Sequence, residues 1–212
     1  MSKLSASMYN LASMAKHKAI LIFGAPGSGK GTLSRFLSGS PLLYHLSSGE
    51  FFRGLSPQSD AGKVFHAYAD KGQLVPDEVT MSLWSAYVDT LITSNRFNPK
   101  EQWLLLDGIP RTPNQAELIK KYVDIESVLV LEVPREQELI DRIAKRAAQE
   151  KRGDDADPAV FRKRLEVFKE ETLAVLEGYP PSMIHKINAQ QTPLCVARDA
   201  LIILSELIKD ED

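Results

Sequence analysis

The sequence predicts an α/β protein: a doubly wound parallel sheet of five strands flanked by helices. Strand-like and helical segments alternate along the whole chain, an order that is typical of parallel sheets. Two strand-like runs, 103–107 and 127–133, are continuously apolar. Such runs are typical of parallel strands that helices cover on both faces. The other expected strands are 19–23, 42–47 and 183–188.

Apolar side chains recur at helical spacing between these strands. We expect helices at 134–150 and 158–176, each with an apolar stripe along one side. Proline is favoured at the first helical position, which is where we place Pro134 and Pro158. Asp157, directly before the second of these prolines, is expected to cap that helix.

A long stretch, 48–100, separates the second and third expected strands and is mostly helical. It is too long for a plain crossover between parallel strands, so we interpret it as an inserted lobe. The lobe is placed at about 48–78, and the core of the domain is placed at 19–47 and 101–212. Pro76 before Asp77 indicates that a helix begins there.

The composition is that of an ordinary globular protein. The 212 residues are 43% hydrophobic and 25% charged, with a net charge of −2. This balance argues against a dedicated nucleic-acid binder, which is usually basic. No apolar run approaches the roughly 20 residues that span a bilayer. The one cysteine, Cys195, can form neither an internal disulfide nor a cysteine-cluster zinc site.

The first 18 residues contain no acidic side chain; the first in the chain is Glu50. The segment is faintly similar to an organelle transit peptide, but it lacks arginine, and it has no apolar core of the kind found in secretory signals. We interpret 1–18 as a poorly ordered leader before the first strand. The expected location is cytoplasmic, with organelle targeting left open.

The segment "GAPGSGKGT", 24–32, lies between an expected strand and the helical pattern "TLSRFL". Glycines allow successive backbone N–H groups to surround an anion, and the following helix adds its positive end. Lys30 would supply a charge for the β and γ phosphates of a nucleotide. The pattern fits G-x-x-x-x-G-K-[ST] with Gly31 in the Ser/Thr place and Thr32 one place late. A glycine turn without a ligand is the alternative. The expected nucleotide-binding residues are Gly24, Ala25, Pro26, Gly27, Ser28, Gly29, Lys30, Gly31 and Thr32.

This loop resembles that of the nucleoside monophosphate kinases, above all the adenylate kinases. Further segments resemble that family in the family's order: "HLSSGEFFRG", "KGQLVPDEVT", "LLLDGIPRTPNQAEL", and "DRIAKR" followed by "RGDDADPAVFRKRL". The resemblance covers about 19–205. It implies a P-loop kinase fold with a helical NMP-binding insertion, and reversible Mg²⁺-dependent transfer of the terminal phosphoryl group of ATP to AMP, giving two ADP.

Phosphoryl transfer to a monophosphate needs cations rather than a general base. The acceptor phosphate is already largely ionised near neutral pH, and two polyanions must be brought together. The resemblance implies that Lys30, Arg111, Arg146, Arg152 and Arg164 are catalytic, that Arg142 and Arg146 bind ATP, and that Asp154 and Asp155 position lid arginines. The AMP-binding residues it implies are Ser48, Gly49, Arg53, Leu74, Val75, Gly108, Arg111, Gln115, Arg152 and Arg164.

Two residues bear on the choice of base. Ser48 and Gln115 match the adenylate kinases, in which the amide can donate to adenine N1 and accept from N6. Glu50 departs from the adenylate-kinase aspartate and is associated with the pyrimidine group, and Ile109 replaces the usual Phe. The alternatives are a UMP/CMP-type kinase and a nucleotide-binding regulatory protein.

The resemblance also implies a short lid and a magnesium site. Only "AAQEK" separates Arg146 from Arg152, so a short lid without zinc is expected at about 146–155. Asp107, at the end of an apolar strand, is interpreted as organising Mg²⁺ through waters. The expected partners are ATP, AMP and ADP, with no nucleic acid and no membrane, and the expected state is a monomer.

Overall fold

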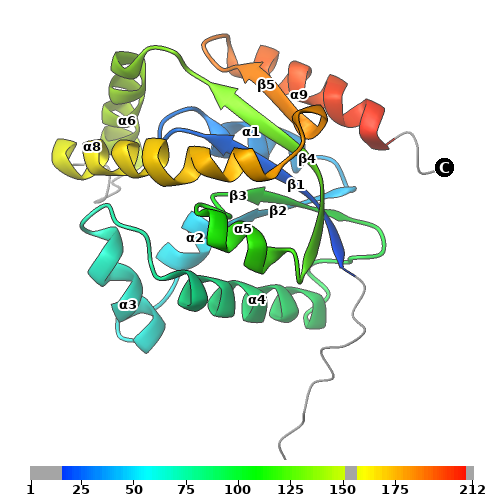
Figure 1. Cartoon of the computed structure of the whole chain (residues 1–212), viewed down its shortest axis with the longest axis horizontal. Helices are drawn as coiled ribbons and strands as arrows, with labels where there is room; N and C mark the ends of the chain where they lie inside the picture. The colour runs from blue at the N-terminus through cyan, green and yellow to red at the C-terminus, as the bar shows by residue number, and fades with distance from the viewer. Residues whose placement is uncertain (1–15, 151–156, 209–212) are drawn as a thin grey trace, which may run out of the picture.

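The centre of the molecule is one parallel five-stranded sheet, as predicted. The computed structural model describes residues 16–150 and 157–208, apart from the side chains of 149–150. The strand order is β2-β3-β1-β4-β5, and every neighbouring pair is parallel (Figure 1). The strands are β1 (His17–Gly24), β2 (Leu43–Ser47), β3 (Trp103–Asp107), β4 (Val123–Glu132) and β5 (Ile184–Asn188).

The three inner strands, β3, β1 and β4, point alternate side chains into two separate cores. On one face, Leu21 packs in a cluster with the fully buried Trp84 from α4 (Asp77–Thr93), and α5 (Pro113–Ile119) completes this layer. On the other face, Ile20 packs with Leu37 from α1 (Lys30–Leu37) and with α9 (Pro193–Ile208). Each fully buried side chain of this size contributes roughly 1.5–3 kcal/mol through removal from water.

Two strands begin earlier than predicted. β1 begins at His17, and β4 begins at Val123, four residues before the expected start. The two starts pair with each other in the sheet. The first part of β4 includes the exposed Asp124, so it lacks the continuous apolar character by which the rest of the strand is recognised.

The helix after β4 also differs at its start. α6 spans Glu136–Glu150, so the placement of Pro134 at its first position is wrong. The first turn of the helix closes on Arg135 instead, whose carbonyl accepts a hydrogen bond from the Glu138 N–H at 3.1 Å. α8 does begin at Pro158, as predicted, and the carboxylate of Asp157 accepts a hydrogen bond from the Ala159 N–H at 2.8 Å.

The expected helix 158–176 is interrupted. α8 ends at Val167, and a π-helical turn, Phe168–Thr172, and a 3₁₀ segment, Leu173–Gly178, continue the chain. The hydroxyl of Thr172 donates a hydrogen bond to the Arg111 carbonyl at 3.1 Å. A π turn inside a helix often lies at a functional site. A second 3₁₀ turn, Pro181–Met183, leads into β5.

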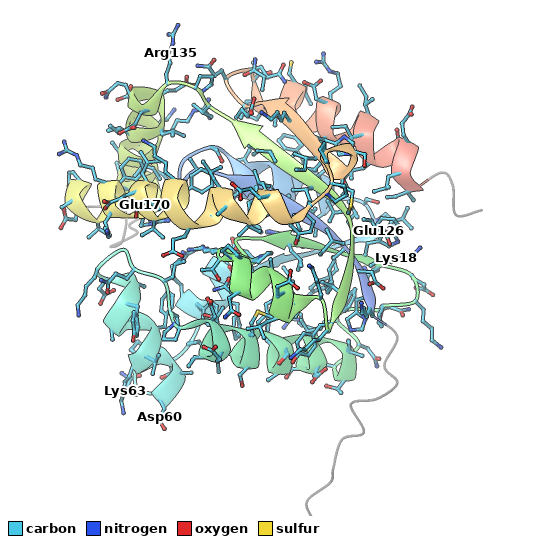
Figure 2. The ribbon with its side chains drawn as sticks, in the orientation of Figure 1. Lys18, Asp60, Lys63, Glu126, Arg135 and Glu170 are labelled. Carbon is cyan, nitrogen blue, oxygen red and sulfur yellow. The ribbon has the colours of Figure 1, made fainter. Side chains whose placement is uncertain are left out.

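The stretch between β2 and β3 forms three helices: α2 (Ser48–Arg53), α3 (Asp60–Ala69) and α4, which begins directly after Pro76, as expected. α2 and α3 project to one side of the sheet (Figure 1). Charged side chains such as Lys63 on α3 point outward (Figure 2). In the described part of the chain, no helix has the length and apolarity needed to cross a membrane.

Candidate nucleotide-binding site

The glycine-rich loop joins β1 to α1, as predicted. The Ser28 N–H donates to the Ala25 carbonyl at 3.0 Å, which closes a turn. Gly29 has a left-handed backbone with φ of 100°, and its carbonyl accepts from the N–H groups of Thr32 and Leu33. The loop therefore ends in a helix N-terminus, whose N–H groups and dipole favour an anion.

The side chain of Lys30 turns back towards the start of this loop. Its ammonium donates to the carbonyl of Gly24 at 2.6 Å and to that of Ala25 at 3.2 Å. Burial lowers the pKa of Lys30 to about 8, although the nearby carboxylate of Asp107 raises it. The positive charges that lower this pKa further are Arg111, Arg164 and Arg146. The positive charges of Lys30 and of three predicted arginines therefore lie close enough to affect one another. Such a concentration of positive charge suits the binding of a polyanion.

A larger cavity extends from the loop towards α6 and the start of α9. Seven loop residues, from Pro26 to Thr32, line it together with Arg142 and Arg146. Gly24 lines the neighbouring cavity instead. Ala25, predicted at this site, packs against the apolar cluster between α6 and α8.

Arg142 is fixed at one end of the larger cavity. Its guanidinium donates to the Glu138 carboxylate at 2.5 Å and to the Ala189 carbonyl at 2.8 Å. Sequence reasoning missed the neighbours of Arg142 in the connection from β5 to α9. Their one sequence signal is that they follow the carboxyl end of a parallel strand. The cavity residues missed there are Ala189, Gln191, Pro193 and Val196.

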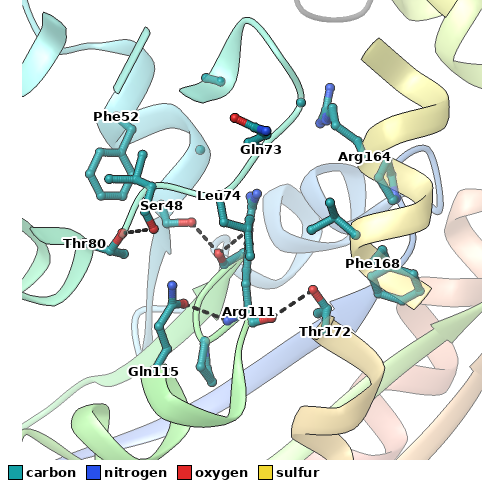
Figure 3. A pocket seen from close by; sticks show the side chains of 18 of the residues that line it. Ser48, Phe52, Gln73, Leu74, Thr80, Arg111, Gln115, Arg164, Phe168 and Thr172 are labelled. Carbon is teal, nitrogen blue, oxygen red and sulfur yellow. Dashed lines mark hydrogen bonds between the residues drawn. The ribbon is translucent and has the colours of Figure 1, made fainter. Parts of the chain in front are cut away.

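A second cavity adjoins the first, between α2, the end of the lobe, α5 and α8. It brings together nine of the ten residues predicted for the monophosphate: Ser48, Gly49, Arg53, Leu74, Val75, Gly108, Arg111, Gln115 and Arg164. The tenth, Arg152, and the lid residues Asp154 and Asp155 lie outside the described residues. Sequence reasoning missed Phe168 and Thr172, which the π turn presents to this cavity (Figure 3).

Gly108 lies between two polar side chains of the second cavity. The Ser48 hydroxyl and the Arg111 Nε both donate to its carbonyl at 2.7 Å. Its φ is +84°, and an added Cβ would lie 2.8 Å from the Ser48 hydroxyl and 3.0 Å from the Arg111 guanidinium. Glycine is therefore required here both by the backbone and by the close approach of the two polar side chains.

Gln115 is 2% exposed and held at both ends of its amide. Its Oε1 accepts from the Arg111 backbone N–H at 2.8 Å, and its Nε2 donates to the Asp77 carboxylate at 2.8 Å. The first of these bonds is drawn in Figure 3. Within 16–150 and 157–208, no further partner takes the second N–H and the second lone pair of the amide, which suit a ligand.

Asp107 ends β3, lines the larger cavity and is 9% exposed. With the hydroxyl of Thr32 on the same cavity, it offers the hard oxygen donors that Mg²⁺ takes. Among the described residues, no group of three or more His, Cys, Asp or Glu could hold a metal ion directly. These donors suit an ion that keeps most of its waters.

The two cavities meet at four cationic side chains. Lys30, Arg53, Arg111 and Arg164 line both. Guanidinium groups match phosphate oxygens in pairs, and an ammonium acts as a point charge. The arrangement can bind two phosphorylated ligands with their phosphates facing each other at this junction.

Comparisons with known proteins agree with this geometry. A family model described as adenylate kinase matches residues 22–184. An adenylate kinase of Bacteroides thetaiotaomicron is 36% identical over 166 residues, which is 76% of this chain and 83% of that protein. One of Cyanothece sp. is 37% identical over 166 residues, 76% and 80% of the two chains. One of Flavobacterium psychrophilum is 32% identical over 176 residues, 80% and 88%. The family model spans well over half of the sequence, and the chain therefore belongs to the adenylate kinase family.

Proposed function

We propose that this chain transfers the terminal phosphoryl group of ATP, bound with Mg²⁺, to AMP, reversibly and with two ADP as products. The observation that carries this proposal is the junction of two cavities at Lys30, Arg53, Arg111 and Arg164. A donor and an acceptor phosphate would meet there, between cations that neutralise both.

The larger cavity is proposed to hold ATP. Its β and γ phosphates would lie on the loop's N–H groups and on Lys30, as the loop's position at the start of α1 supports. The adenine would lie beside Arg142, whose guanidinium the carboxylate of Glu138 and the Ala189 carbonyl hold in place.

Phosphoryl transfer requires these residues to position the substrates and to supply positive charge. The acceptor phosphate needs no proton removed, so the site has to hold the reacting oxygens in line and to stabilise charge on the transferring group. Arg111, Arg146 and Arg164 are proposed to do this with Lys30, and Arg152 is proposed to join them from the lid. Mg²⁺ bound with ATP supplies further charge neutralisation, and Asp107 would hold its waters.

The smaller cavity is proposed to select adenine through Gln115, with Ser48 at its edge. The free N–H and lone pair of the amide suit adenine N1 and N6. Glu50 is exposed and does not line this cavity, so it supports no pyrimidine preference. Ile109 is 2% exposed in the apolar core. There it takes the place of the family's Phe, which is also an apolar side chain.

Three further proposals come from the sequence and its family. The segment at about 146–155 serves as a short lid, and its closure would exclude water from the junction. The protein acts as a monomer. It works in the cytoplasm on ATP, AMP and ADP, without nucleic acid or a membrane as a partner.

The Gln115→Leu variant tests the base assignment. Leu keeps the apolar bulk and removes the amide, so kcat/KM for AMP is expected to fall by about 10-fold or more, as loss of one or two hydrogen bonds implies. KM for ATP is expected to stay unchanged. Gln137→Leu is the matched control, because Gln137 is exposed on α6 and lines neither cavity. An unchanged kcat/KM for AMP in Gln115→Leu would contradict the assignment.

A further inference from the structure

The structure assigns Asp77 as the positioning residue that fixes the orientation of the Gln115 amide and thereby sets the preference for adenine over guanine. This inference rests on the proposed reading of the base by Gln115. Asp77 is the first residue of α4, and Gln115 belongs to α5, 38 residues further along the chain. The carboxylate thus connects the end of the inserted lobe to the base site.

The hydrogen-bond partners of Gln115 define which end of the amide is which. The Arg111 backbone N–H can only donate, so it requires the Oε1 of Gln115, at 2.8 Å. The carboxylate of Asp77 accepts, so it requires Nε2, at 2.8 Å. A flipped amide would set two N–H groups against each other and an oxygen against a carboxylate. Both bonds would be lost, in a side chain that is 2% exposed.

Asp77 is itself held in place by donors. Its second oxygen accepts from the Thr112 hydroxyl at 2.9 Å and from the Asn114 amide at 3.0 Å. Thr112 also caps α5, because its hydroxyl accepts from the Gln115 backbone N–H at 3.0 Å. The side chain that orients the amide and the backbone that carries it are therefore tied to one small network.

A fixed amide distinguishes the two purines. Adenine presents an acceptor at N1 and a donor at N6, whereas guanine presents a donor at N1 and an acceptor at O6. The remaining N–H and lone pair of Gln115 fit the adenine order, and guanine would require the flip that Asp77 and Arg111 oppose. Of the two groups that fix the amide, Arg111 acts through its backbone N–H and Asp77 through its side chain.

The test compares kcat/KM for AMP with kcat/KM for GMP, using MgATP as donor. Asp77→Ala removes one of the two bonds that orient the amide, so the AMP-to-GMP ratio is expected to fall about 10-fold, the equivalent of a hydrogen bond to a charged group. Asp77→Asn should keep most of the ratio. Its oxygen can still accept from Gln115, and the Thr112 hydroxyl and Asn114 amide can turn to accept from its NH₂.

Asn114→Ala is the matched control, because Asn114 shares the carboxylate but is exposed and does not contact Gln115. Its ratio should equal that of the unaltered protein. An acid in the first turn of α4 also stabilises the helix, so Asp77→Ala can lower the melting temperature, but that effect alone would leave the ratio and KM for ATP unchanged. An unchanged ratio in Asp77→Ala would overturn the inference. If Gln115→Leu in the same assay still weakens AMP, the base assignment survives that result; if it does not, the base assignment fails first.

Discussion

Gly31 and Gly29 make a matched pair, and the structure predicts opposite effects on stability when each is changed to alanine. Among the described residues, an added Cβ at either position would meet nothing within 4 Å, apart from its chain neighbours and, at Gly31, the backbone of its own helix. The two differ in backbone: Gly31 is the second residue of α1, whereas Gly29 has a left-handed φ of 100°. Space is equal, so the backbone alone decides the sign.

The magnitudes follow from that difference. Gly31→Ala removes conformational freedom from the unfolded chain and should stabilise the ligand-free protein by about 0.4–1 kcal/mol. Gly29→Ala forces an L side chain into the left-handed region and should destabilise it by about 1–2 kcal/mol. For a chain of this size, 1 kcal/mol corresponds to a change in melting temperature of about 2–4 °C.

The assay is thermal and urea denaturation without nucleotide, followed by titration with ATP. Gly31→Ala should melt higher yet bind ATP more weakly, because Gly31 lines the larger cavity and its new methyl group would occupy space beside the phosphates. If Gly31→Ala is destabilising, or if Gly29→Ala is neutral, the backbone argument is refuted. If Gly31→Ala binds ATP normally, glycine at this place is not required by the ligand.

Three other predictions concern separate parts of the site. The pKa of Lys30 is lowered to about 8, and bound phosphates should raise this pKa again, so the affinity for ATP should fall as the pH rises above 8. The accompanying proton uptake can be measured by calorimetry in buffers of different ionisation enthalpy. An affinity for ATP that does not change with pH would contradict the burial of this ammonium. Thr172→Val removes the hydroxyl that donates to the Arg111 carbonyl and should cost about 0.5–1.5 kcal/mol in denaturant unfolding, whereas Thr172→Ser should cost less; equal losses would show that the hydroxyl is unimportant. Arg142→Ala should raise KM for ATP about tenfold through lost stacking on the base and leave KM for AMP unchanged; a rise in both would point to a wider structural role.

The parts of the fold predicted best are those that apolar patterning determines. β3 was expected at 103–107 and spans Trp103–Asp107, because every residue of it is buried. β4 extends further than its apolar run, since its first residues include the exposed Asp124. The π turn at Phe168–Thr172 was not foreseen, because helical periodicity in the sequence continues through it.

The site was predicted where side-chain chemistry is distinctive. The lysine and most arginines of the two cavities were named from their motifs, and so was Gln115. Ala189 and Pro193 were missed because small apolar side chains carry no chemical signal, and only the fold brings them beside Arg142. Asp77 was noted only at a helix start, where an acid is favoured in any case, and its bond to Gln115 depends on a contact between segments distant in the sequence.

The most direct test of the proposed reaction is a comparison of phosphate acceptors. The purified chain, with MgATP as donor, is given AMP, GMP, CMP or UMP in turn, and the formation of nucleoside diphosphate is followed. We expect kcat/KM for AMP to far exceed that for the other three, because the orientation of the Gln115 amide fits adenine. A preference for CMP or UMP would contradict the base assignment, and ATP binding without transfer to any acceptor would contradict the proposed reaction itself.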